Sequence, residues 1–230
     1  SDGYVSIFAW FSIIGISLGV AAIIIVMSVM NGFRIDLTNR IIGLNSHLNI
    51  YSFDNEITNK QADELILNID NSFFYQHYKS IETNGLIIKS NNSKGVMIKG
   101  YDAYDKNHYL FNSINMGALI QNPKSEILIG DSLANEMNLS VGDKVKIAIP
   151  KTDKTILGNI PRFKTLEVVG VFDLGLYEYD SNLIFLSSEL VRKLLLYDED
   201  IYNKIEFFTS SPNEIELFKN KVELETSNLL

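Results

Sequence analysis

The residue types that usually carry catalytic chemistry are present in this chain, but they do not form a catalytic pattern. His47, His77 and His108 lack the spacing of metal ligands, and the absence of cysteine excludes disulfides and thiolate metal sites. Gly95 and Gly100 have the glycine spacing of a phosphate-binding loop, but Tyr-Asp follows where a lysine and a hydroxyl residue are needed. No Gly-x-Ser-x-Gly elbow for a nucleophilic serine occurs. We therefore expect no enzymatic activity, no metal and no cofactor.

Composition narrows the remaining classes of function. The chain has 230 residues, of which 46% are hydrophobic, so it can bury the core of one or two domains. Asp2 is the only charged residue before Arg34, so the part after Phe33 carries 20 basic residues and 28 minus 1, or 27, acidic residues. The resulting net charge of −7 argues against a nucleic-acid partner, which would select a basic surface.

The N-terminal segment Gly3–Phe33 predicts a transmembrane helix. It contains no charged residue over 31 positions. As a helix it would be about 45 Å long, enough to cross a hydrocarbon core of about 30 Å. A signal peptide fits less well, because its apolar region is normally only about 7–15 residues long. We expect contact with membrane lipids, whereas the charges that flank the segment leave its orientation open.

One face of this predicted helix is lined by small residues. Ser12, Gly15, Gly19 and Ala22 recur at spacings of three and four, which places them on one stripe. Such a stripe lets a second membrane helix approach closely, although glycine is also common in membrane helices by chance. We expect these four residues to pack against another membrane helix.

The remainder of the chain predicts an α+β domain in two parts. A strand over residues 46–52 precedes a helix that Thr58 and Gln61 would cap, and "KIEFFT" precedes a helix that Ser211, Pro212 and Glu214 would cap. Between these units lie mainly short strands and a turn at 141–143. We expect a transmembrane helix over 3–33, an α/β subdomain formed by 45–84 and 187–230, and a β-rich insertion over 85–186.

The connection between the strands "KVKIAI" and "LEVVGVF" is much longer than a hairpin turn of about 2–5 residues. Residues 150–165 hold four cationic residues and Asp153, a net charge of +3 within an otherwise acidic region. Apolar residues flanked by cations suit a partner with an apolar groove and a polar rim, and the alternative is a surface loop folded back on its own domain. The residues expected to bind a partner are Pro150, Ile156, Leu157, Ile160, Pro161, Arg162, Phe163 and Lys164.

Most of the chain resembles the LolC/LolE-type permeases, which are membrane subunits of the lipoprotein-releasing ABC transporter of Gram-negative bacteria. The resemblance starts at "SIFAWFSIIGISLGVAAIIIVMSVMNGFRIDLTNRIIGLNSHLNIY" and continues through "IKGYD", "ILIGDSLANEMNLSVGDKVKIAIP" and "LEVVGVF". The segment "GNIPRFKTLEVVG" is similar to the exit of the protruding hook loop of LolC-type members. The family often has Gln-Arg where this chain has Phe163 and Lys164.

This resemblance implies a setting and a set of partners. The domain would be periplasmic, with a Porter-like α/β subdomain, an inserted β-rich Sabre-like subdomain and a hook that docks a LolA-like carrier. A separate LolD-like ATPase and a second permease subunit would act with it on lipoprotein cargo in the inner membrane of a Gram-negative bacterium. Two alternatives remain open at this point: a MacB- or FtsX-like permease with another cargo, and a single-pass sensor whose ectodomain binds a ligand.

Overall fold

The computed structural model describes residues 2–44, 46–51, 56–69, 73–104, 108–155, 158–198 and 200–209, together with residues 215 and 219. The chain divides into two compact units, Ser1–Gly43 and Leu44–Leu230. The helix expected after Ser211 and Pro212 lies outside the described residues, apart from residues 215 and 219, which are helical.

The first unit is formed by the N-terminal helix α1, Asp2–Leu44, which is longer than the segment that the sequence predicted. Its apolar part, Ile7–Ile35, has a mean hydropathy of 2.7 and is long enough to cross a membrane. The side chains of residues 7–35 are all exposed. A helix satisfies its own backbone hydrogen bonds, so such an apolar surface is compatible with lipid.

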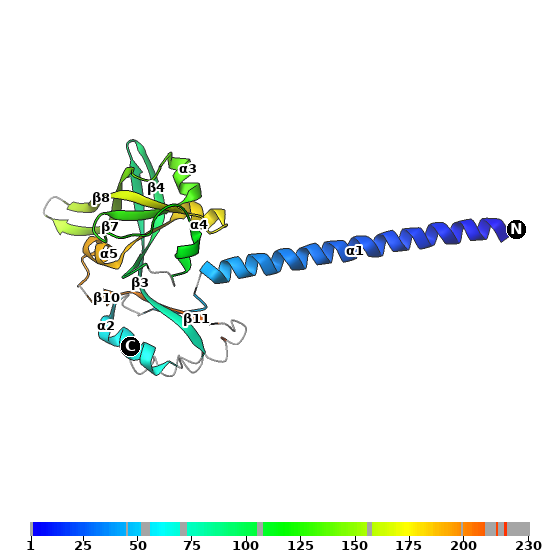
Figure 1. The fold of residues 1–230 in the computed structure, drawn as a ribbon, viewed down its shortest axis with the longest axis horizontal. Coiled ribbons are helices and arrows are strands. Elements are labelled where there is room, and N and C mark those ends of the chain that lie inside the picture. The colour runs from blue at the N-terminus through cyan, green and yellow to red at the C-terminus, as the bar shows by residue number, and fades with distance from the viewer. Residues whose placement is uncertain are drawn as a thin grey trace. The chain divides into compact units, whose positions relative to one another are not determined.

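The second unit is a mixed α/β domain (Figure 1). Its elements are β1 (Leu48–Tyr51), β2 (Ile57–Thr58), α2 (Asn59–Asn68), β3 (Phe74–Lys89), β4 (Asn92–Tyr101), the 3-10 helix η1 (Tyr109–Ser113), β5 (Ile114–Gly117), β6 (Glu126–Gly130), α3 (Asp131–Met137), β7 (Lys144–Thr155), β8 (Gly158–Phe172), α4 (Tyr177–Asn182), β9 (Leu183–Ser187), α5 (Ser188–Leu195), β10 (Ile201–Tyr202) and β11 (Lys204–Thr209).

Six strands of this unit close into a barrel in the order β3–β4–β9–β6–β8–β7, with β7 returning to β3. The pairs β4–β9 and β6–β8 are parallel, and the other pairs are antiparallel. Alternate side chains point inward, as the two-residue period of a strand requires, and fill the barrel with aliphatic groups such as Ile87, Ile98, Ile147 and Val168. Helix α5 packs against β3, β4 and β7.

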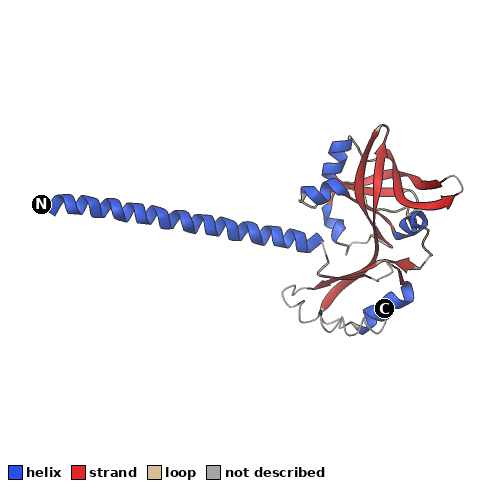
Figure 2. Cartoon of the chain, turned by 180° about the vertical axis from the view of Figure 1, so that it is seen from behind, coloured by secondary structure: helices blue, strands red, loops and turns tan. Residues whose placement is uncertain are grey.

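A second part of the same sheet lies beside α2 (Figure 2). Strand β11 pairs with β1 on one side and with β3 on the other. The predicted capping box is present, because the Thr58 hydroxyl accepts from the backbone N–H of Gln61 and the Gln61 side chain accepts from that of Thr58. The buried face of α2, including Leu65 and Ile66, packs against Phe207 of β11 in a cluster of its own.

Strand β3 belongs to both parts. Its N-terminal half pairs with β11 as far as Ser80, and its C-terminal half pairs with β7 from Leu86. Gly85 lies at this change of partner, where a Cβ atom would be 2.6 Å from Ile98 Cδ1 and 2.7 Å from the Ala148 carbonyl oxygen. The division expected between residues 84 and 85 thus falls inside one continuous strand, and the assignment of two subdomains stays a prediction.

Candidate functional site

The segment 150–165, predicted to be a long loop, is instead the outer part of a β-hairpin. Strands β7 and β8 remain paired beyond the barrel, with Thr152 opposite Pro161 and Thr155 opposite Gly158. Figure 1 shows the ends of both strands projecting from the barrel. The prediction of a loop was wrong because a two-stranded ribbon satisfies the backbone of each strand through the other, without the burial that usually identifies a strand.

An irregularity in β7 explains how the hairpin accommodates proline. The register jumps between Ile149, which pairs with Arg162, and Thr152, which pairs with Pro161. Residues 150 and 151 therefore form a bulge, and Pro150 lies in it. Proline lacks a backbone N–H and is tolerated in sheets at such positions.

The structure places the predicted partner-binding residues at two levels of the hairpin. Pro150, Ile160 and Pro161 belong to the paired strands, whereas Ile156 and Leu157 lie outside the described residues. Arg162, Phe163 and Lys164 lie at the base, where β8 enters the barrel. Their role in binding stays a prediction.

Phe163 belongs to an apolar row across the barrel wall. It lies opposite Ala148 on β7, and Ala148 lies opposite Leu86 on β3. Residues opposite one another in neighbouring strands point to the same face, which places all three on the outer side. The exposed fractions are 55% for Phe163 and 45% for Leu86. Sequence analysis missed Leu86, because its place beside Phe163 depends on the pairing of β3 with β7.

Cationic side chains lie on the same strands as this apolar row. Lys146 on β7 and Lys164 on β8 are exposed, and Lys146 lies opposite Thr165. Arg162 is half-buried, and its Nη1 donates a hydrogen bond of 3.4 Å to the Lys193 carbonyl oxygen of α5. The base of the hairpin is thus attached to α5. Lys146 shares the outer face with Phe163, whereas Lys164 lies opposite the buried Ile147 and therefore on the other face of the strand.

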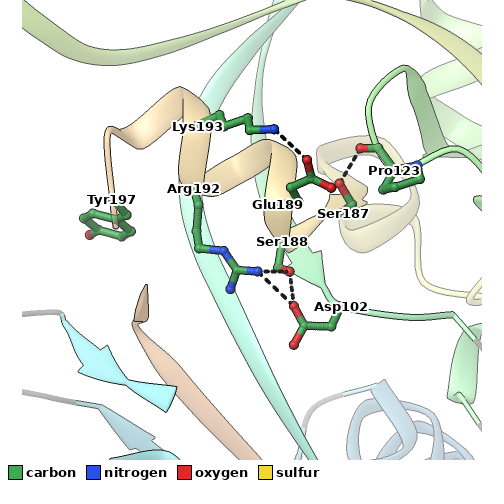
Figure 3. Close-up of a pocket in the computed structure, with 8 residues that line it drawn as sticks. All are labelled: Asp102, Pro123, Ser187, Ser188, Glu189, Arg192, Lys193 and Tyr197. Atoms are coloured by element: carbon green, nitrogen blue, oxygen red, sulfur yellow. Dashed lines mark hydrogen bonds and ion pairs between the residues drawn. The ribbon is translucent and has the colours of Figure 1, made fainter. Parts of the chain in front are cut away.

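A pocket of about 380 Å³ lies beside α5 (Figure 3). Asp102 Oδ1 accepts hydrogen bonds from the Ser188 hydroxyl and, at 3.2 Å, from Arg192 Nη2, and its Oδ2 accepts from the Tyr202 hydroxyl. Burial and the hydrogen bond to Asp102 raise the pKa of Tyr202 to about 12. The pocket is lined by Asp102, Pro123, Ser187, Ser188, Glu189, Arg192, Lys193 and Tyr197.

This cluster has a structural role rather than a catalytic geometry. A nucleophilic serine needs a base that can take up its proton. Asp102, the acceptor of the Ser188 hydroxyl, is already held by Arg192 and Tyr202, and the Arg192 guanidinium carbon lies 4.9 Å from the centroid of the Tyr202 ring. The cluster thus fastens α5 to β4 and β10. Within the described ranges, no group of three His, Cys, Asp or Glu side chains could hold a metal ion.

A second charged cluster is buried where β3, β4 and β11 meet. Glu206 Oε1 lies 3.2 Å from Lys99 Nζ and 3.0 Å from Lys204 Nζ, while Glu206 Oε2 accepts from the Tyr101 hydroxyl at 2.6 Å. Glu82 Oε2 lies 2.9 Å from Lys204 Nζ. Two lysines and two glutamates balance each other's charge, which makes their burial tolerable. We call these four residues the buried ion cluster.

The glycines of the small-residue stripe on α1 are not covered by any part of the chain that the structure describes. A Cβ atom added at Gly15 or Gly19 would meet no described atom within 4 Å, and Ser12 and Ala22 are exposed. A second helix could therefore approach this face, but its packing role stays a prediction.

An apolar helix followed by this mixed α/β unit is a membrane-anchored domain of a recognisable class. Residues 9–223 match the MacB-like periplasmic core domain, and the chain belongs to that family. Among solved structures, the chain is similar to the extracellular domain of the ABC-type transporter YknZ from Gram-positive bacteria, with a TM-score of 0.49 and 14% identity over 74% of this chain and 86% of that chain.

Its relatives include named proteins of one transport system. The chain is 28% identical over 205 residues to the lipoprotein-releasing system transmembrane protein LolC of Neisseria meningitidis, a match that covers 87% of this chain and 49% of that protein. It is 26% identical over 215 residues to LolE of Haemophilus influenzae, covering 90% of this chain and 51% of that protein. The predicted resemblance to LolC/LolE-type permeases is confirmed, and the chain spans about half the length of these relatives.

Proposed function

We propose that this chain is part of a permease subunit of an ABC transporter that extracts lipoproteins from the inner membrane and passes them to a periplasmic LolA-like carrier docked on the β7–β8 hairpin. The main support for this proposal is the β7–β8 hairpin. Its strands stay paired beyond the barrel, and it is positively charged although the domain as a whole is acidic. The similarity to proteins named for lipoprotein release supports the cargo.

The surface chemistry of the hairpin and its base suits such a carrier. Residues 150–165 have a net charge of +3, whereas the rest of the chain after Phe33 has a net charge of −7 minus 3, or −10. The exposed Phe163 and Leu86 give the surface an apolar centre, and the exposed Lys146 lies on the same face. Lys164 is exposed on the other face of β8 and adds to the positive charge of the hairpin base. We infer that the carrier contributes an apolar groove with acidic groups at its rim, because desolvated apolar anchors hold a complex and rim charges guide its formation.

Other components would supply what this chain lacks. The sequence has no phosphate-binding loop, so we assign ATP hydrolysis to a separate LolD-like subunit. The open stripe on α1 fits close packing against a helix of a second LolC/LolE-type permease subunit. The apolar surface of α1 would contact membrane lipids, with the second unit in the periplasm.

The test replaces the hairpin while keeping the barrel. Ile149 and Arg162 are paired across β7 and β8, so an Asn-Gly turn in place of residues 150–161 should close the two strands directly. The purified LolA-like carrier is then titrated against this variant and against the wild-type protein. We expect the variant to remain folded, because it keeps the pairing of β7 with β8 from Lys144–Glu167 to Ile149–Arg162, and to lose carrier binding.

A matched control carries Leu67→Ala, at an exposed apolar position on helix α2, away from the hairpin. It should bind the carrier like the wild-type protein. Undiminished carrier affinity in the folded hairpin variant would refute the docking role. Loss of affinity in both variants would show that the measurement reports general damage rather than the hairpin.

A further inference from the structure

The β7–β8 hairpin leaves the barrel as a ribbon of two strands. Among the described strands, β7 pairs with β3 at residues 146–148, and β8 pairs with β6 from Glu167 onward. From Ile149 and Arg162 outward, the described pairing joins β7 and β8 to each other. The bulge at residues 150 and 151 follows at once, and a bulge bends its strand. A two-stranded ribbon is marginally stable by itself, so the direction of the hairpin depends on contacts at its base.

Arg162 lies at this base and points to the opposite face of the sheet from Phe163. Successive residues of a strand alternate between the two faces, and residues paired across strands share a face. Arg162 is paired with Ile149, which is 1% exposed and belongs to the same core cluster as Leu190 of α5. The Arg162 side chain therefore lies on the face that α5 covers, whereas Phe163 lies on the outer face.

The last turn of α5 offers an acceptor that suits the Arg162 guanidinium. The last four carbonyl groups of an α-helix have no donor within the helix. Beyond the end of α5, the N–H groups of Leu196 and Tyr197 both donate to the Arg192 carbonyl oxygen. The carbonyl oxygen of Lys193 accepts instead from Arg162 Nη1 at 3.4 Å. The partial negative charge at a helix C-terminus also favours a cation at this place.

Helix α5 is itself fixed, so it can support the hairpin. The Ser188 hydroxyl and Arg192 Nη2 both donate to Asp102, which directly follows β4. Val191 and Leu194 belong to the core cluster of the barrel. Figure 1 shows α5 close to the ends of β7 and β8 that project from the barrel. Arg162 thus connects a ribbon of two strands to a helix that is anchored along its length.

We propose that Arg162 is a positioning residue, which fixes the direction of the hairpin by holding its base to α5 and does not itself contact the carrier. Arg162 is thereby reassigned from the residues that the sequence predicted to bind the partner. A hairpin already held in its binding direction loses less conformational freedom when the carrier docks. Arg162 therefore raises carrier affinity through the hairpin. The inference rests on the proposed function for the identity of the docked partner.

The test first measures the direction of the hairpin without any carrier. The chain contains no cysteine, so Thr152→Cys on the hairpin and Met97→Cys, at a 38% exposed position on β4, can be spin-labelled in the complete 230-residue chain in detergent. Double electron–electron resonance gives the distribution of distances between the two labels. We expect Arg162→Gln to widen this distribution about twofold or more, because the ribbon loses its support.

A matched control is Lys164→Gln, which removes an exposed cation from the same face of β8. It should leave the distance distribution unchanged. The second readout is titration of the purified LolA-like carrier against the unlabelled chains. Arg162→Gln should weaken carrier affinity about three- to tenfold, because a smaller fraction of the hairpins points in the binding direction.

The two readouts separate a positioning role from a direct contact. Weaker carrier binding by Arg162→Gln with an unchanged distance distribution would show that Arg162 contacts the carrier, and it would overturn the proposal. Equal widening in Arg162→Gln and Lys164→Gln, or a wider distribution without any loss of carrier affinity, would overturn it as well.

Failure of this inference can be distinguished from failure of the proposed function, because the distance measurement needs no carrier. Carrier binding that depends on the hairpin, together with an unchanged distribution in Arg162→Gln, would leave the proposed function standing and reject the positioning role. A wider distribution in Arg162→Gln, together with no carrier binding by the wild-type chain, would reject the proposed function and support the contact of Arg162 with α5.

Discussion

The buried ion cluster gives the sharpest stability prediction, through the change Glu206→Gln. The Glu206 side chain is 1% exposed and lies between Lys99 and Lys204, which are 4% and 5% exposed. Glutamine keeps the shape of the side chain but removes its charge. Two buried ammonium groups would then share only Glu82, whose side chain is 25% exposed.

The magnitude follows from the cost of leaving a buried charge without its partner, which is about 3–5 kcal/mol. Glu82 remains 2.9 Å from Lys204 and compensates in part, so we expect about 3 kcal/mol. For a domain of this size each kcal/mol lowers Tm by about 2–4 °C, which gives a decrease of about 6–12 °C. Glu189→Gln, which removes an exposed ion pair with Lys193, should cost less than about 1 kcal/mol.

The difference in stability between the wild-type protein and Glu206→Gln should become smaller in acid. Burial raises the pKa of Glu206, but Lys99, Lys204 and the Tyr101 hydroxyl outweigh burial and hold this pKa below its usual range. A carboxyl group with a lowered folded-state pKa stabilises the protein above its unfolded pKa of about 4.3, and this contribution is lost as pH falls through the folded pKa. As pH falls from the unfolded pKa through the lower folded-state pKa, wild-type Glu206 therefore comes to resemble glutamine.

The assay is thermal unfolding of the compact unit Leu44–Leu230 followed by circular dichroism at several pH values. The difference in Tm between the wild-type protein and Glu206→Gln should be largest near neutral pH and should shrink in acid. A decrease no greater than that of Glu189→Gln, or a difference that does not change with pH, would refute the assignment of a charged, stabilising Glu206.

Three further predictions concern other parts of the chain. Gly85→Ala should lower the free energy of unfolding by about 1–3 kcal/mol in denaturant titrations, because its Cβ would crowd the Ala148 carbonyl oxygen, whereas Gly95→Ala has open space and should cost nothing. Lys164→Glu should slow association with the LolA-like carrier more at low salt than at high salt in stopped-flow measurements, and equal slowing at both would contradict a steering role. Gly19→Leu should reduce recovery of the assembled transporter from membranes, and normal assembly would exclude close helix packing at the α1 stripe.

The parts of the fold that the sequence predicted depend on residues close together in the chain. The capping box of α2 needs only Thr58 and Gln61, and the turn before β7 needs Gly142, which has a φ of +92°. The apolar helix α1 is likewise a local property of composition. Such features could be predicted because residues close together in the sequence determine them.

The features that sequence analysis missed depend on distant pairing. The barrel closes when β7 returns to β3, and the resulting row of Leu86, Ala148 and Phe163 joins residues from three strands. The buried ion cluster joins Lys99 to Glu206 across the sheet, and either residue alone has the sequence appearance of an ordinary surface charge. Periodicity reports which face of a strand is buried, but it does not report which strand lies beside it.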